Sequence, residues 1–253
     1  MPELEFRLLD DETFDDIPTP TQPGARCQTC DYWERLDGGR AAPEADAPDR
    51  ASRESLKRSR LLSGRSISGA YAMLAYRTDA VERAAVGYAQ FGPLSAYPRA
   101  QDIRDRYPQL PESPAPWVVT CLQVGPIATA EERADVGRAL LDAVCDELDG
   151  RGITAVEAYP ERVPDAWLPS PGPASVYEQA GFEHAAGDDR FPVYRRELSG
   201  ETDADAWSGL LRASTPSDEG DDWPLPLPPK GDPDDLFRLP PEGPKKPNPF
   251  GED

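Results

Sequence analysis

Cysteine and histidine most often carry metal or nucleophilic chemistry, and this chain has few of either. Its four cysteines include one close pair, Cys27 and Cys30, in a CxxC arrangement. Such a pair suggests zinc binding or thiol–disulfide chemistry, but zinc needs four ligands and no second CxxC or CxxH pair exists. Cys121 and Cys145 fall in apolar runs and are more simply explained as core residues. Because His184 is the only histidine, no Cys–His or Ser–His–Asp nucleophile is credible, and we expect no metal.

The stretch from 117 to 160 is the part around which the rest of the chain is organised. Residues 117–124 form a near-continuous apolar run, as expected of a strand covered on both faces. Residues 153–159 look like a second strand, and the segment between them has one apolar face of a helix, at Val136, Leu140, Val144 and Leu148. This pattern predicts a strand–helix–strand unit with two parallel strands. The turn before such a helix presents backbone N–H groups to an anion.

The start of that helix has two candidate positions. TAEE at 129–132 is a capping box and predicts a start at residue 130. Its two glutamates would then satisfy the helix dipole and repel a phosphate. A start near Asp135 would instead leave Arg133 and Arg138 beside a bound phosphate.

Other segments are expected to complete a sheet and its helices. Alternating patterns predict a first strand, a hairpin and a last strand, at 3–9, 67–77 with 84–93, and 190–198. Helices are predicted at 51–64, ended by Gly64, around 100–106, and at 174–180, closed by Gly181.

The chain is expected to have three parts. Residues 1–65 form an N-terminal segment that carries the CxxC pair and the adjoining YWE, and residues 66–199 form the core. Eleven of the 30 prolines lie in residues 201–253, among acidic runs and few aliphatic residues. That composition predicts a disordered tail over 200–253.

Charge and hydropathy exclude several classes of function. The formal net charge is −20, so nucleic acid is not an expected partner. Only four residues are lysine, and this acidic, lysine-poor composition resembles that of halophilic proteins. No apolar run is long enough to span a membrane, and the N-terminus lacks a signal-peptide pattern. We therefore expect a cytoplasmic protein with reduced cysteines and no membrane partner.

The order of these elements carries a family resemblance. With the segments VVTCLQVGP, VGRALLDAV, AVEAYP and PGPASVYEQAGFE, it resembles the GNAT superfamily of acyl-CoA N-acyltransferases over roughly residues 66–198. The resemblance implies an α/β (α+β) fold. Its sheet would be mixed and mostly antiparallel, with six or seven strands, a central splayed parallel pair and flanking helices. The implied activity is direct transfer of an acetyl group from acetyl-CoA to a primary amine of a small molecule or peptide.

The resemblance also implies where acetyl-CoA is held. Strand 117–124 would splay from its parallel neighbour after a bulge, so that the backbone of Leu122, Gln123 and Val124 meets the acetyl and pantetheine groups. The pyrophosphate would sit at the start of the following helix, against Arg133, Ala134, Asp135, Val136, Gly137 and Arg138. The family pattern there is Arg or Gln, two residues, Gly, one residue, then Gly or Ala. Only its second glycine, Gly137, is present in this chain.

Two residues are candidates for proton transfer. Tyr177 matches the tyrosine that in many GNAT enzymes protonates the departing thiolate, a role that suits a phenol. Its alternative is a core tyrosine packed beside Phe182. Glu157 is a candidate base or water-orienting group, because it lies on a strand beside the expected splay. The alternative for Glu157 is a carboxylate at the sheet edge or one paired with an arginine.

The acceptor side of the cleft is expected to include Tyr32, Trp33 and Glu34, because the N-terminal segment forms that wall in GNAT folds. Gln90 is a further candidate for the acceptor pocket, with ordinary hairpin packing as its alternative. A rival function is a catalytically inactive GNAT-like module that binds or regulates a partner through its C-terminal tail. The altered phosphate turn favours this rival, whereas Tyr177 and strand 117–124 favour the enzyme. The acceptor's identity and the oligomeric state stay open.

Overall fold

The computed structural model describes residues 3–20, 26–35, 49–79, 84–125, 129–160, 172–187 and 192–199. The chain divides into two units, Met1–Leu210 and Leu211–Asp253, and every described residue belongs to the first. The predicted disordered tail lies outside the described residues and stays a prediction. No helix in the described part of the chain is long and apolar enough to cross a membrane.

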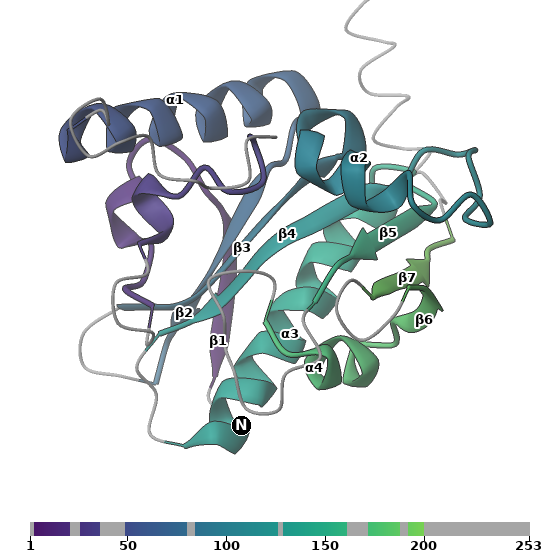
Figure 1. Cartoon of the computed structure of the whole chain (residues 1–253). Coiled ribbons are helices and arrows are strands. Elements are labelled where there is room, and N and C mark those ends of the chain that lie inside the picture. Colours follow the sequence, from purple (N-terminus) through teal and green to yellow (C-terminus); the bar gives the residue numbers. More distant parts are fainter. Residues whose placement is uncertain are drawn as a thin grey trace, which may run out of the picture. The chain divides into compact units, whose positions relative to one another are not determined.

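Seven strands form one mixed sheet in the order β1-β2-β3-β4-β5-β7-β6 (Figure 1). Only the β4–β5 pair is parallel, and the other neighbours are antiparallel. The predicted class, a mostly antiparallel sheet with a central parallel pair, is therefore confirmed. The strands are β1 Leu4–Leu8, β2 Ala72–Arg77, β3 Ala84–Pro93, β4 Trp117–Val124, β5 Ala155–Ala158, β6 Glu183–Ala186 and β7 Val193–Glu197.

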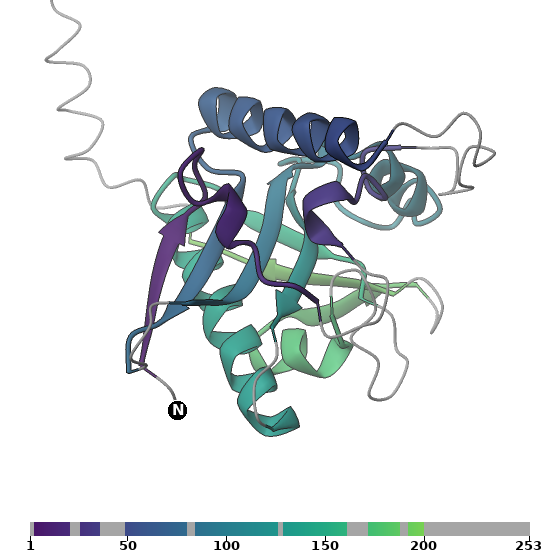
Figure 2. The same ribbon diagram turned by 90° about the vertical axis from the view of Figure 1, so that its left-hand side faces the viewer.

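In the described part of the chain, four α-helices cover the two faces of this sheet. The helices α1 (Arg50–Ser68) and α2 (Pro98–Arg104) lie on one face, whereas α3 (Ala130–Asp149) and α4 (Ala174–Gln179) lie on the other (Figures 1 and 2). Each face has its own apolar core. We call these two faces of the sheet the α1/α2 face and the α3/α4 face.

Helix α1 is longer than the sequence predicted. Asp49 caps it by accepting the Ser52 N–H at 2.9 Å, and the helix continues through Gly64 to Ser68. It ends at Gly69, whose φ of 77° lies in the left-handed region. A Cβ on Gly64 would clash with the ring of Tyr71. The glycine at 64 therefore allows close packing and does not end the helix.

Strand β6 was not predicted. It pairs with β7 at one edge of the sheet, and its first three residues are exposed. A short edge strand with exposed polar residues lacks the apolar alternation by which a strand is recognised in sequence. The predicted turn at Gly181 is present, with φ 77°.

Strand β4 is irregular at the point where it leaves β5. On β3, Gln90 pairs with Cys121 while the next residue, Phe91, pairs with Val119, so Thr120 is an extra residue in β4. The Thr120 hydroxyl donates to the Gln90 carbonyl oxygen at 3.3 Å. Pairing of β4 with β5 ends at Val119, whereas β4 itself continues. The bulge implied by the resemblance is present, and the pairing of β4 with β5 ends where β5 itself ends, at Ala158. The implied splay stays a prediction.

Candidate active site

Tyr177 lies on α4 and is fully buried. Its ring packs edge-on against Phe182, with 5.2 Å between the ring centroids. The hydroxyl has no hydrogen-bond partner among the described residues. Burial raises the pKa of Tyr177 well above its ordinary value of 10, so the hydroxyl stays protonated. A buried hydroxyl without a partner costs about 1–3 kcal/mol, and a bound ligand with an acceptor atom would relieve that cost.

A buried polar cluster lies on the α1/α2 face. The ammonium of Lys57 on α1 donates to Oε1 of Glu34 and to Oε1 of Gln90, each at 2.7 Å. Nε2 of Gln90 donates to the same Glu34 oxygen at 2.9 Å. Two tyrosine hydroxyls complete the cluster: Tyr88 donates to Oε1 of Gln90, and Tyr97 accepts from Nε2, both at 3.3 Å. We call these five residues the Lys57 cluster.

Within the Lys57 cluster, Lys57 and Glu34 are both held in their charged forms. Burial alone would raise the pKa of Glu34, but the charge of Lys57 and the hydrogen bonds from Lys57 and Gln90 outweigh it and lower that pKa below 4.5. Burial alone would lower the pKa of Lys57, but Glu34 outweighs it and raises that pKa above 10.5. The two side chains are only 3% and 9% exposed. They therefore form a desolvated ion pair, in which each charge depends on the other.

The predicted acceptor wall lies on this same face. The Arg99 guanidinium stacks 3.8 Å from the centroid of the Tyr32 ring, and its Nε donates to the Tyr32 carbonyl oxygen at 2.8 Å. Trp33 is buried and packs against Tyr159, with 6.0 Å between ring centroids. Since Tyr159 directly follows β5, the structure brings the Tyr32–Glu34 segment to the end of that strand.

Glu157 on β5 is fully buried within a second charged cluster. Its Oε2 accepts from Nε of Arg104 at 3.0 Å and from the Tyr159 hydroxyl at 3.1 Å, and its Oε1 accepts from Nη1 of Arg195 at 2.8 Å. These contacts match the alternative of a carboxylate paired with arginine. They occupy both oxygens, so a role for Glu157 as a base stays a prediction without support from this geometry.

The cysteine thiols are buried or half-buried and stay protonated. Burial raises the pKa of Cys27 and of Cys145 to about 12, and it also raises the pKa values of Cys30 and Cys121. A protonated thiol is a poor nucleophile and a poor metal ligand. Among the described residues, no group of three or more His, Cys, Asp or Glu side chains could hold a metal ion.

The residues predicted to bind pyrophosphate lie inside α3. Of the two candidate starts, the structure has the one at Ala130. The Thr129 hydroxyl accepts the Glu132 N–H at 3.1 Å, and the Thr129 carbonyl accepts the Arg133 N–H at 3.1 Å. Residues 133–138 are therefore helical, and their N–H groups point back into the helix.

The two ends of an acetyl-CoA molecule fit this chain differently. Leu122, Gln123 and Val124 continue β4 beyond its pairing with β5, and the buried Tyr177 hydroxyl has no partner among the described residues, so these residues stay the candidates for the thioester end. The pyrophosphate does not fit residues 133–138, because the N–H groups that would receive it are used by the helix.

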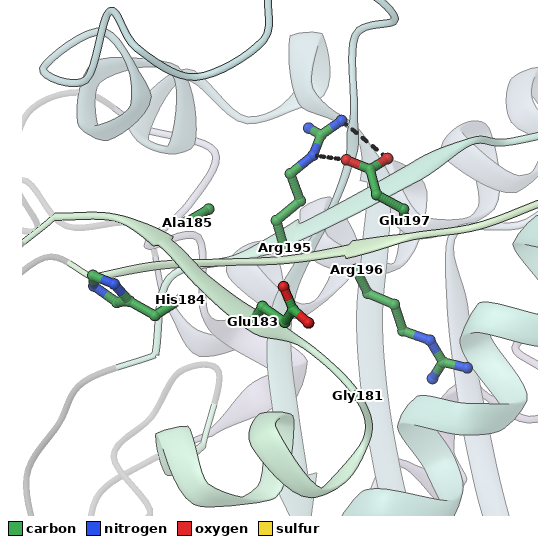
Figure 3. A pocket seen from close by; sticks show the side chains of 7 residues that line it. All are labelled: Gly181, Glu183, His184, Ala185, Arg195, Arg196 and Glu197. Carbon is green, nitrogen blue, oxygen red and sulfur yellow. Dashed lines mark hydrogen bonds and ion pairs between the residues drawn. The ribbon is translucent and has the colours of Figure 1, made fainter.

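A separate pocket of about 370 Å³ lies beside β6 and β7 (Figure 3). Its arginines are engaged internally: Arg195 pairs with Glu197 at 2.6 Å as well as with Glu157, and Arg196 pairs with Asp142 at 3.0 Å. None of the predicted catalytic, donor-binding or acceptor-binding residues lines it. The lining residues are Gly181, Glu183, His184, Ala185, Arg195, Arg196 and Glu197.

Comparison with known proteins gives structural likeness only. No protein-family model and no curated protein matches the sequence. The C-terminal condensation domain of Ebony, solved with β-alanyl-dopamine, is 11% identical with a TM-score of 0.52, covering 78% of this chain and 100% of that domain. A Desulfovibrio desulfuricans protein described as a GNAT-family acetyltransferase is 17% identical with a TM-score of 0.42, over 78% and 100% of the two chains. The Drosophila melanogaster polyamine N-acetyltransferase is 15% identical with a TM-score of 0.45, over the same shares.

Likeness at these identities shows the fold alone. The strand order and the bulged β4 agree with the fold class predicted from the sequence, a GNAT-like mixed sheet with a central parallel pair and flanking helices.

Sequence reasoning missed Lys57. A signal was present, because lysine is rare in this chain and Lys57 lies four residues before the buried Leu61 on the same face of α1. A lysine on an apolar helix face needs a buried partner, and that requirement could have linked it to Glu34.

Proposed function

We propose that the protein transfers an acetyl group from acetyl-CoA directly to a primary amine. The observation that carries the proposal is the buried hydroxyl of Tyr177, which has no partner among the described residues, in a sheet whose β4 continues beyond its pairing with β5. We assign Tyr177 the role of proton donor to the departing thiolate. The backbone of residues 122–124 is proposed to hold the donor's thioester end.

The proposed chemistry balances without a cofactor. The amine nitrogen attacks the thioester carbonyl carbon, so that a C–N bond forms and the C–S bond breaks. The thiolate takes the proton of the Tyr177 hydroxyl, and the nitrogen loses a proton that finally returns the tyrosine to its protonated form. The products are an amide and a free thiol. The raised pKa of Tyr177 keeps the hydroxyl protonated, so that a proton is present when the thiolate departs.

We propose that the amine enters from the α1/α2 face, beside Tyr32, Trp33, Glu34 and Gln90. Glu34 is a carboxylate, but Lys57 already compensates its charge at 2.7 Å. Attraction of a cationic amine therefore cannot come from Glu34 alone, and the aromatic rings of the wall would supply apolar and cation–π contacts.

A turnover assay tests the proposal. Purified protein is incubated with acetyl-CoA and a panel of primary amines, while thiol release and the mass of the amide product are followed. We expect thiol and amide to form in equal amounts with at least one amine class. If acetyl-CoA binds but no amine is acetylated, the rival function as a binding or regulatory module replaces the enzyme. The acidic, capped start of α3 is the observation that favours this rival.

A further inference from the structure

The start of α3 has lost the features that bind a diphosphate. Thr129 supplies the cap that would otherwise come from an anion, by accepting the Glu132 N–H. Glu131 and Glu132 occupy the first turn, where their charges already interact favourably with the helix dipole. A diphosphate placed there would meet two carboxylates at the position where a GNAT donor site needs positive potential.

One cation near the helix start, Arg77, is already engaged. Nη1 of Arg77 lies 3.1 Å from Oε1 of Glu132, and its Nε lies 2.6 Å from Oδ1 of Asp79. These two carboxylates more than neutralise the guanidinium. On the next turn, Arg138 pairs with Asp142 at 3.2 Å. Binding a phosphate through either arginine would require breaking an existing ion pair.

Gly137 does not provide a substitute site. It is buried in the second turn of α3, between Val136 and Arg138, within continuous helix. Close approach of a phosphate to a glycine requires exposed backbone N–H groups, which a helix interior does not present. The glycine that survives from the family pattern therefore offers no exposed backbone N–H group to a phosphate.

The other end of the donor site is intact. β4 continues past Val119, where its pairing with β5 stops, and the Tyr177 hydroxyl has no hydrogen-bond partner among the described residues. Under the proposed function, these features serve the thioester and the amide groups of a pantetheine arm. None of them involves the nucleotide of coenzyme A.

We infer that this protein selects its donor through the acyl-pantetheine arm, and that the 3′-phospho-ADP part of coenzyme A contributes little to binding. The inference rests on the proposed function and narrows its donor to the class of acyl-pantetheine thioesters. An enzyme of this kind uses acetyl-pantetheine nearly as well as acetyl-CoA.

Calorimetric titration of the full chain tests this with three ligands: coenzyme A, pantetheine, and adenosine 3′,5′-bisphosphate. Salt is kept near 0.1 M, so that ion–phosphate contacts are screened little. We expect dissociation constants for coenzyme A and pantetheine within about tenfold of each other, a difference below about 1.4 kcal/mol, and no saturable binding of the bisphosphate. Coenzyme A binding at least about a hundredfold tighter than pantetheine would overturn the inference and leave the proposed function standing. Binding of neither thiol would overturn the proposed function and the inference with it.

A charge reversal at the start of α3 provides a second experiment. Glu131→Lys should tighten coenzyme A binding by about two- to fivefold through the helix terminus, and leave pantetheine binding unchanged. Asp146→Lys, near the other end of α3, makes the same charge change and should alter neither. Equal effects of Glu131→Lys on both thiols would count against the inference.

Discussion

The two faces of the sheet differ in where they keep their polar groups. The α1/α2 face contains two buried ionic clusters, one around Lys57 and one around Glu157. The α3/α4 face is apolar, and Tyr177 is its one fully buried hydroxyl without a partner in the described part of the chain. On the first face the two ionic clusters compensate their own charges, and Nη2 of Arg99 on α2 is the buried polar atom without a hydrogen-bond partner in the described part of the chain. On the second face that atom is the uncharged hydroxyl of Tyr177.

This contrast separates stability from chemistry. Buried ion pairs whose members satisfy each other hold a structure in one arrangement, and removing one partner leaves the other uncompensated. A buried hydroxyl without a partner does the opposite, because it costs stability and keeps a proton available. The Lys57 and Glu157 clusters are therefore expected to shape the acceptor side, and Tyr177 to act in the reaction.

The largest expected effect is on turnover. Tyr177→Phe should lower kcat about 10²–10⁴-fold, because the proton donor to the thiolate is lost. The same change should raise the free energy of unfolding by about 1 kcal/mol, since it removes an unsatisfied polar atom. The two measurements are an acetyl-transfer assay and urea denaturation.

Tyr194→Phe is the matched control. Tyr194 is equally buried on the same face, but its hydroxyl donates to Glu178 at 2.7 Å. Its loss should destabilise the fold and leave kcat unchanged. An unchanged rate in Tyr177→Phe would remove that residue from the mechanism.

Lys57→Met should reduce the free energy of unfolding by about 3–5 kcal/mol, because Glu34 is left buried without its counter-charge. Replacing both residues, as Lys57→Met with Glu34→Gln, should recover part of that loss. Arg106→Met removes an exposed pair with Asp102 and should cost less than about 1 kcal/mol. Urea denaturation curves measure all three, and equal losses for Lys57→Met and Arg106→Met would contradict a desolvated pair.

Glu157→Gln separates the two interpretations of that carboxylate. As an ion-paired residue it should cost about 3 kcal/mol in unfolding free energy, because Arg104 and Arg195 lose a shared counter-charge. Its kcat, measured where the variant is fully folded, should stay within about threefold of the original, since general-base catalysis would instead be worth about 10²-fold or more. A loss of that larger size in a folded variant would restore Glu157 as a base.

The smallest expected effect is a dependence on pH. The folded state lowers the pKa of Glu34, so its ion pair stabilises fully above pH 4.5 and loses that contribution as the pH falls through the lowered value. Glu34→Gln has no such carboxylate. The difference in unfolding free energy between the original chain and this variant should therefore shrink in acid, which denaturation at a series of pH values measures. A constant difference would mean that the pair is not ionised in the folded protein.

The sheet was predictable because its central strands repeat apolar residues over their full length. β4 was placed at its observed bounds, and the parallel pair followed from the helix between the strands. β6 was not predictable, because an edge strand of exposed polar residues carries no periodic signal. Gly64 misled the prediction of α1, since its role depends on Tyr71, which packs against it in three dimensions.

Only those parts of the candidate site that local sequence patterns indicate could be predicted. Glu34 and Gln90 were expected on the acceptor side. Nε2 of Gln90 lies 2.9 Å from Oε1 of Glu34, although the two residues are far apart in the sequence. The partner that joins them, Lys57, comes from a third segment that local patterns do not connect to either. The capping box at Thr129 is a local signal, and it correctly indicated the helix start at Ala130.

The extra residue in β4 sets which side chains face each side of the sheet. Side chains alternate along a strand, so one added residue reverses the phase of everything after it. Val119 faces α3 before the bulge, and Leu122 faces α3 after it, which leaves Cys121 on the opposite side beside Gln90. Deleting Thr120 would remove the bulge and let Cys121 follow Val119 in regular alternation, with Leu122 and Gln123 on the faces they have now. A regular strand that kept Thr120 would instead place the polar Gln123 in the apolar core and Leu122 on the α1/α2 face. The bulge therefore lets the sequence carry one additional residue while the apolar residues on both sides of it stay on the same face.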